Sequence, residues 1–260
     1  MAISLKSISR TVRNSLPPRV VVHGAQKVGK STFAAGAYKP IFLPLEDGLS
    51  GIEADAFNGG KPLASYEEVE QALAALYSDE HDFGTVVVDS IDWLEPLIWR
   101  HVCEKNGWAS IESPGYGRGY IEANATWRTF LDKLNTLRTD RGMAIILIAH
   151  SIVKRFEAPD SESFDRIELK LQKGALGLVV EWSDAILYAQ EETAVKKEKL
   201  AGDNVRTRGV STGRRIINCN AKPAFIAGNR YNLPDVLLLD WNVMVNAMAP
   251  ATQPEQAAAA

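Results

Sequence analysis

The chain has few of the residues and runs that define several protein classes. Only two cysteines occur in 260 residues, Cys103 and Cys219, and they form no metal-binding spacing. This pattern favours small buried thiols in a reducing compartment over a disulfide framework. No stretch approaches the roughly 18 apolar residues of a membrane span, and residues 1–19 contain no apolar run typical of a signal peptide. We therefore expect a cytoplasmic protein with no membrane partner.

An excess of positive charge is also missing. The formal net charge of −3 argues against a globally basic nucleic-acid binder, although a local basic strip is compatible with it. With 46% hydrophobic residues, the chain can bury the core of one α/β domain with an appendage. We predict an N-terminal arm at residues 1–18, a domain at residues 19–248 and a disordered tail at residues 249–260, where alanine, proline and glutamine predominate.

One segment carries a phosphate-binding motif in full. Residues 24–32 match G-x-x-x-x-G-K-[ST], between a β-branched run at 20–22 and a helix-compatible segment from Phe33. Glycines let the backbone turn tightly so that N–H groups converge on phosphate, a lysine adds a cation, and the Ser31 hydroxyl can bind Mg²⁺. The predicted nucleotide-binding residues are Gly24, Ala25, Gln26, Lys27, Val28, Gly29, Lys30, Ser31 and Thr32. The chain is expected to bind a nucleoside triphosphate.

Short apolar runs alternate with amphipathic segments along the chain. The runs at 19–23, 40–45, 84–89, 143–149 and 185–189 are typical of buried strands, and apolar stripes after Ser65, Ser90 and Tyr120 are typical of helices. This alternation predicts an α/β fold with a mostly parallel sheet between helices. Residues 214–219 and 224–227 are expected to form short antiparallel strands that extend the sheet.

Asp89 ends the run Thr85–Val88 and is the second chemical signal. An acid at the end of the strand beside a P-loop holds the magnesium shell, so Ser31 and Asp89 are the predicted metal residues. Ser90 follows, and the adjacent Asp–Glu pair of many motor ATPases is therefore missing. The base that activates water must come from elsewhere.

Glu46 is the favoured base because it follows the predicted strand 41–45 at the sheet edge where ligands bind. Asp92 and Glu95 compete for this role. Both fall within the helix pattern after Asp89, where a solvated face is the simpler interpretation.

The order of these motifs resembles the RecA-type ATPase core. Within it, the chain resembles the RecA-core nucleotide-binding proteins that bacteriophages encode near recombination genes. The segments that carry the resemblance are Phe42–Leu49, Val88–Pro96, Tyr116–Tyr120, Ile148–Ser151, Phe164–Arg166, Glu181–Asp184 and Asn229–Pro234. The resemblance implies ATP and Mg²⁺ binding, ATPase activity and a role in phage DNA recombination, annealing, replication or repair.

The resemblance also implies roles for single residues. Glu46 is similar to the residue that orients the attacking water, and His150 stands where RecA itself carries a glutamine that senses the γ-phosphate. A histidine that simply caps the strand end is the alternative. Arg230 is similar to a basic residue that reaches the ATP of a neighbouring subunit, although relatives often carry a second cation where this chain has Gly228. An exposed arginine in a turn is the alternative for Arg230.

Two segments occupy places that resemble the DNA-facing loops of RecA proteins. One contains Tyr116 and Arg118 among glycines, and the other contains Lys154, Arg155 and Phe156. Aromatic and cationic side chains together suit single-stranded DNA, through base stacking and phosphate neutralisation. The second segment also contains as many acids, so a solvated surface loop explains it equally well.

Together these patterns predict a RecA-type ATPase that acts on single-stranded DNA as a homo-oligomer, with a single-strand-binding or replication protein as a further partner. Two other functions fit the same P-loop. One is a small-molecule kinase, and the other is a nucleotide-switched scaffold without turnover.

Overall fold

The computed structural model describes residues 16–157, 162–199 and 205–248. The elements run from Arg19 to Met248. Most of the predicted N-terminal arm and the whole predicted tail at 249–260 lie outside the described residues.

The centre of the molecule is a mixed sheet with the order β10-β8-β7-β1-β5-β4-β2-β3, in which β6 also pairs with β5 and β9 with β7. The strands are β1 (Arg19–Gly24), β2 (Pro40–Pro44), β3 (Asp55–Ala56), β4 (Thr85–Asp89), β5 (Ala144–Phe156), β6 (Phe164–Leu169), β7 (Ala185–Lys199), β8 (Val205–Asn218), β9 (Gly228–Asn229) and β10 (Val236–Leu238). The ladders among β7, β1, β5, β4, β2 and β3 are parallel, and those to β6, β8, β9 and β10 are antiparallel. This confirms the predicted α/β architecture with a mostly parallel sheet and C-terminal antiparallel strands.

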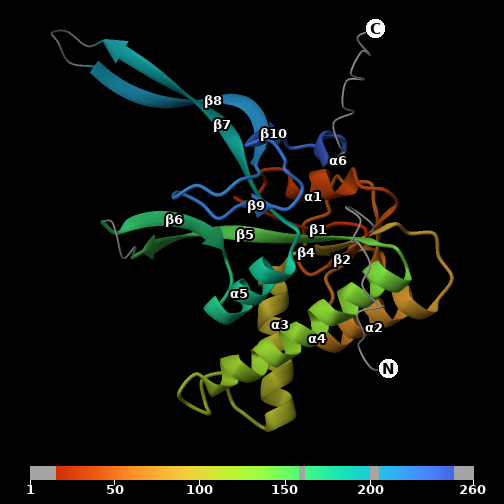
Figure 1. Cartoon of the computed structure of the whole chain (residues 1–260). Helices are drawn as coiled ribbons and strands as arrows, with labels where there is room; N and C mark the ends of the chain where they lie inside the picture. Colours follow the sequence, from red (N-terminus) through yellow and green to blue (C-terminus); the bar gives the residue numbers. More distant parts are fainter. Residues whose placement is uncertain (1–15, 158–161, 200–204, 249–260) are drawn as a thin grey trace, which may run out of the picture.

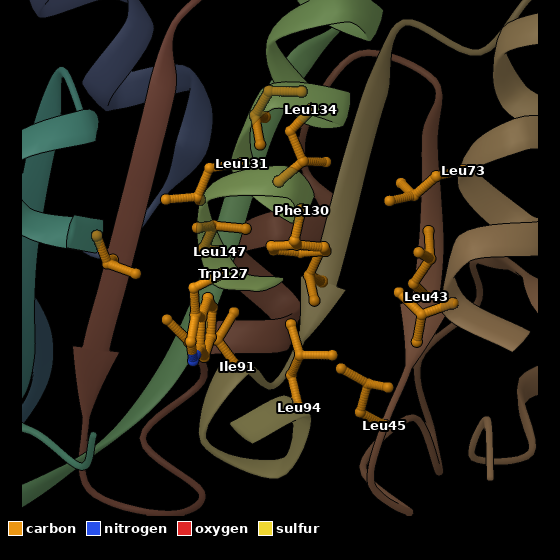
Figure 2. Close-up of a cluster of buried hydrophobic side chains, with 14 of the residues drawn as sticks. Leu43, Leu45, Leu73, Ile91, Leu94, Trp127, Phe130, Leu131, Leu134 and Leu147 are labelled. Carbon is orange, nitrogen blue, oxygen red and sulfur yellow. The ribbon is translucent and has the colours of Figure 1, made fainter. Parts of the chain in front are cut away.

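Helices cover both faces of the sheet (Figure 1). They are α1 (Lys30–Ala35), η2 (Phe57–Gly60), α2 (Tyr66–Ser78), α3 (Ile91–Asn106), α4 (Arg118–Asp140), α5 (Lys173–Trp182) and α6 (Trp241–Met248). The larger core lies between the sheet and α2 to α5, where Leu43, Leu94 and Phe130 are buried (Figure 2). The smaller core lies under α1 and α6. Burial of both faces explains why the parallel strands are apolar throughout. In the described part of the chain, no helix has the length and apolar character that crossing a membrane requires.

The local signals for α2 are visible in its hydrogen bonds. The Ser65 hydroxyl accepts the backbone N–H of Glu68 at 3.2 Å, and the Glu68 carboxylate accepts the backbone N–H of Ala64 at 2.7 Å. These bonds satisfy donors that the first turn of a helix leaves without partners. The start of α2 is therefore fixed by contacts within the five consecutive residues 64–68.

Three expectations about strand extent differ from the structure. The strand expected at 185–189 continues to Lys199 and pairs with β8 in a long hairpin that projects from the sheet (Figure 1). The strand expected at 224–227 is wrong, because only isolated bridges occur at Phe225 and the nearby strand is β9. Residues 151–173, expected as a surface loop, contain a second hairpin because β5 runs on to Phe156 and pairs with β6.

Candidate nucleotide site

The phosphate-binding motif forms the turn between β1 and α1. Gly24 pairs with Ala189 of β7 in the parallel ladder, and a Cβ atom on Gly24 would lie 2.3 Å from the Ala189 carbonyl oxygen. Gly29 precedes α1 with a φ of 107°, in the left-handed region that favours glycine. Both glycines of the motif are therefore required by the backbone itself.

Lys30 is buried at the start of α1, with 6% of its surface exposed. Its ammonium group donates to the carbonyl oxygen of Ala25 at 2.8 Å and to that of Gly24 at 3.2 Å. Burial lowers the pKa of Lys30, while the carboxylates of Asp89, Glu46 and Asp92 act in the opposite direction. The cation is thus held inside the turn and faces a group of acids.

Ser31 and Asp89 meet across the end of the sheet. The Ser31 hydroxyl donates to the Asp89 carboxylate at 2.6 Å, and Asp89 is the last residue of β4. Burial raises the pKa of Asp89 to about 6, with a further increase from Glu46, although the Ser31 hydrogen bond lowers it.

A hydroxyl and a carboxylate supply the oxygen ligands that Mg²⁺ prefers, and this ion normally completes its shell with water and phosphate. Among the described residues, no group of three or more His, Cys, Asp or Glu is placed to hold a metal ion. The pair therefore fits the predicted magnesium site.

Glu46 is brought to the site by the ladder between β2 and β4. Leu45, which follows β2, donates its backbone N–H to the Asp89 carbonyl oxygen at 2.6 Å. This contact places the next residue, Glu46, beside the end of β4. The Glu46 carboxylate then lies 3.8 Å from Nε2 of His150.

His150 pairs with Gly24 at the end of the parallel ladder between β1 and β5, and Asp92 fixes its side chain. Its Nδ1 atom lies 3.0 Å from the Asp92 carboxylate, which also accepts the backbone N–H of His150 at 3.0 Å. Burial alone would raise the pKa of Asp92, but the hydrogen bonds from His150 outweigh it and the pKa is lowered. Asp92 therefore remains an anion that orients the histidine ring.

The simple interpretation of Asp92 and Glu95 as solvated helix residues is wrong, because 8% and 6% of their surfaces are exposed. Both carboxylate oxygens of Glu95 accept the backbone N–H of Gln172 at 3.1 Å, and burial raises the pKa of Glu95 to about 7. One acid is therefore engaged with His150 and the other with the start of α5. Glu46 lines the cavity beside the phosphate-binding turn, and these two do not.

The phosphate-binding turn and the side chains of Asp89, Glu46 and His150 surround one cavity of about 460 Å³. Its lining includes Gln26, Lys27, Gly29, Lys30, Ser31, Thr32, Glu46, Asp89, His150 and Arg215. Arg215 of β8 was not among the predicted site residues. The pairing of β7 with β8 brings Arg215 to the cavity. The adjacent Arg214 is the same residue type, so no local sequence pattern shows which of the two arginines reaches the site.

A family model described as an AAA domain matches residues 16–231. The chain belongs to the AAA domain family. The SPbeta prophage-derived uncharacterized protein YorG of Bacillus subtilis (strain 168) is 26% identical over 205 residues, which are 78% of this chain and 54% of that protein. The chain thus spans about half the length of this curated relative.

A likeness to a solved structure was also found. The crystal structure of the RadB recombinase aligns with a TM-score of 0.45 and 16% identity, covering 85% of this chain and 86% of that one. The sequence resembled P-loop ATPases that bacteriophages encode. The family match and the prophage-derived relative confirm this resemblance.

Arg230 lies at the other end of this AAA domain. It donates from its backbone to the Asp184 carbonyl at 2.9 Å, and its guanidinium lies 3.3 Å from the Asp184 carboxylate. Asp184 precedes β7 and also pairs with Arg19 at the start of β1. Because the phosphate-binding turn follows the end of β1, Arg230 is at the opposite edge of the sheet from the cavity of its own chain.

The residues predicted to contact DNA lie outside the cavity, on two separate elements. Tyr116 is fully exposed and Arg118 begins α4. Arg155 pairs with Asp165 across the β5–β6 hairpin at 3.6 Å, and the Phe156 ring lies under the Arg166 guanidinium at 3.9 Å. Lys154 donates to the Leu171 carbonyl at 3.3 Å. The hairpin cations are therefore partly satisfied within the chain.

Proposed function

We propose that the protein binds ATP with Mg²⁺ and hydrolyses it at the cavity beside β1. The observation that carries this proposal is the convergence of Lys30, the Ser31–Asp89 pair, Glu46 and His150 on one cavity. These side chains come from the ends of three parallel strands, β2, β4 and β5, and from the helix that follows β1. A cation, a magnesium ligand pair and an acid that lines the cavity are the groups that phosphoryl transfer to water needs.

In the proposed reaction, a water molecule attacks the γ-phosphorus while the bond to the oxygen shared with the β-phosphate breaks. Glu46 accepts the proton of the water, and ADP leaves with the electron pair of the broken bond. Lys30 offsets negative charge on the phosphates, and Ser31 and Asp89 hold the magnesium shell. As an imidazolium whose Nδ1–H is held by Asp92, His150 donates its Nε2–H to a phosphate oxygen and senses its loss.

The proposed second ligand is single-stranded DNA. A groove of about 600 Å³ between α4 and α5 is lined by Tyr116, Tyr120, Ile121, Arg128 and Lys173, among others. Arg128 and Lys173 are exposed and have no ion pair with another described residue. The exposed ring of Tyr116 beside these cations suits stacked bases and a phosphate backbone.

The β5–β6 hairpin would connect this DNA surface to the nucleotide site. His150 is followed directly by the hairpin, and its carbonyl accepts the backbone N–H of Lys170, just before α5, at 2.9 Å. A movement of His150 that follows loss of the γ-phosphate would therefore reach both the hairpin and α5. The prophage-derived relative supports a phage setting. Within that setting, the proposed role is DNA recombination, annealing, replication or repair in the host cytoplasm, as the sequence resemblance implies.

We further propose that the protein acts as a homo-oligomer, ring or filament, in which Arg230 of one subunit reaches the nucleotide of the next. Its position at the edge opposite the cavity, with its side chain 62% exposed, supports a contact with a neighbouring subunit rather than with its own nucleotide. A single-strand-binding or replication protein remains the proposed further partner.

An assay of phosphate release with and without single-stranded DNA tests this function. We expect hydrolysis that requires Mg²⁺ and increases with DNA. Transfer of phosphate to a nucleoside would instead establish a kinase. Nucleotide binding without turnover, in the presence and absence of DNA, would establish a switched scaffold.

A further inference from the structure

Arg215 approaches the phosphate-binding turn from the side of β8. It lines the same cavity as Lys30 and Glu46. One guanidinium nitrogen lies 3.1 Å from the position that a Cβ atom on Gly29 would occupy. Its side chain is exposed and makes no hydrogen bond or ion pair that the described residues supply, although Glu191 is directly opposite in the ladder. An unpaired guanidinium therefore lies directly against the turn that binds phosphate.

The backbone of Arg215 is held in place on both sides. It pairs with Glu191 of β7 in the antiparallel ladder, and its carbonyl accepts the N–H of Leu239 at 3.0 Å. The next residue, Ile216, is buried. Arg214 differs, because its guanidinium lies 3.5 Å from the Glu192 carboxylate and it does not line the cavity. The chain thus offers two adjacent exposed arginines, of which one faces the site.

The sheet order separates Arg215 from the proposed hydrolytic groups. Strands β7 and β8 lie on one side of β1, whereas β5, β4 and β2, which position His150, Asp89 and Glu46, lie on the other. A nucleotide whose γ-phosphate is beside those three groups therefore presents its α- and β-phosphates toward Arg215.

We propose that Arg215 is a phosphate-binding residue that contacts the α- and β-phosphates of the nucleotide within its own subunit. This inference rests on the proposed nucleotide site and adds a contact that ATP and ADP share. A guanidinium offers paired donors that match phosphate oxygens, and such charge-assisted bonds are stronger than neutral ones. Because the contact is common to both nucleotides, it contributes to affinity for each and has little effect on the chemical step.

The test compares four variants of the full chain: Arg215→Ala, Arg215→Lys, Arg214→Ala and Lys30→Ala. Titration with Mg-ADP and with Mg-ATP gives the affinities, and steady-state phosphate release gives kcat and KM. We expect Arg215→Ala to weaken binding of both nucleotides by about tenfold or more and to raise KM with kcat nearly unchanged. Arg215→Lys should recover part of the loss, and Arg214→Ala should bind like the unmodified protein.

The outcomes separate failure of this proposal from failure of the proposed site. If Lys30→Ala loses nucleotide affinity while Arg215→Ala matches Arg214→Ala, the site stands and the role of Arg215 is overturned. If Arg215→Ala weakens ATP but not ADP, or lowers kcat alone, Arg215 acts at the γ-phosphate and its placement here is wrong. If Lys30→Ala also keeps full affinity, the nucleotide site itself is in error. Thermal unfolding of each variant confirms that the protein being titrated is folded.

Discussion

The Asp92 carboxylate accepts two hydrogen bonds from His150, one from the ring and one from the backbone N–H, each at 3.0 Å. A residue of α3 therefore fixes both the position and the ring orientation of a residue of β5. With Nδ1 donating to Asp92, Nε2 points toward Glu46 at 3.8 Å. In the proposed reaction, this pairing is what presents the histidine to the γ-phosphate.

Asp92→Asn tests whether this orientation matters for turnover. The amide can still accept the backbone N–H, but it has no negative charge to stabilise an imidazolium. Its NH₂ group donates to Nδ1, which leaves a neutral ring with its proton on Nε2, so the contact with phosphate loses its positive charge. We expect kcat to fall by about tenfold or more with little change in ADP affinity. Nitrogen NMR of the imidazole should show that Nδ1 has lost its proton. Asp132→Asn, which changes an exposed acid on α4, is the control, and loss of the Nδ1 proton with unchanged kcat would contradict a role for the charged ring of His150 in turnover.

Glu46→Gln should retain nucleotide binding and lose hydrolysis. The amide preserves the size of the side chain but cannot accept a proton from water, so only the base function is removed. Parallel measurements of Mg-ATP affinity and phosphate release check this, with the exposed Glu53→Gln as the matched control. Turnover that survives in Glu46→Gln but stops in Asp92→Asn or Glu95→Gln would show that the wrong acid was chosen.

Glu95 should make the folded state less stable as the pH rises. Its pKa is raised by burial from 4.5 to about 7. Between these values the folded protein holds a proton that the unfolded chain releases, so the free energy of unfolding decreases with increasing pH. Glu95→Gln cannot lose a proton and can still accept the N–H of Gln172. Relative to the unmodified protein, this variant should gain roughly 1–3 kcal/mol between about pH 5 and about pH 8, measured by urea unfolding. Parallel profiles for the two proteins would contradict the raised pKa.

Arg230 gives a test of assembly. Arg230→Ala and Glu46→Gln subunits, each inactive alone, should partly restore ATPase activity when mixed, because an intact Glu46 site can then meet an intact Arg230. Arg230→Ala should leave the fold intact, because Arg19 and Arg138 still pair with the Asp184 carboxylate when the exposed Arg230 guanidinium is removed. An inactive mixture with assembly verified, or normal hydrolysis by Arg230→Ala alone, would rule out the action across an interface.

The sequence was sufficient where the signal is local. The P-loop, the apolar strands and the helix after Ser65 each depend on neighbouring residues, and the five predicted strands begin within one residue of their expected starts. The length of the β7–β8 hairpin was not predicted, because strand pairing depends on partners distant in sequence. Arg215 was missed for the same reason.

The environment of Asp92 was missed for a different reason. It pairs with His150 across 58 residues, a contact that no local pattern reports. Glu95 did carry a usable signal, because it lies in the same helical phase as the buried Ile91, Ile98 and Val102. An acid within an apolar stripe indicates a buried carboxylate with a dedicated hydrogen-bond donor, here Gln172.

Lys30→Ala is the most direct test of a nucleotide site in this chain. The Lys30 ammonium group lies inside the phosphate-binding turn and carries the positive charge next to the Ser31–Asp89 pair. It donates to two carbonyl oxygens of that turn. The measurement is titration of the folded variant with Mg-ATP, beside the unmodified protein and with thermal unfolding as the check on folding. The account predicts that the unmodified protein binds and that Lys30→Ala loses measurable affinity and turnover. A folded Lys30→Ala protein that binds Mg-ATP as tightly as the unmodified chain would contradict the assignment of the site.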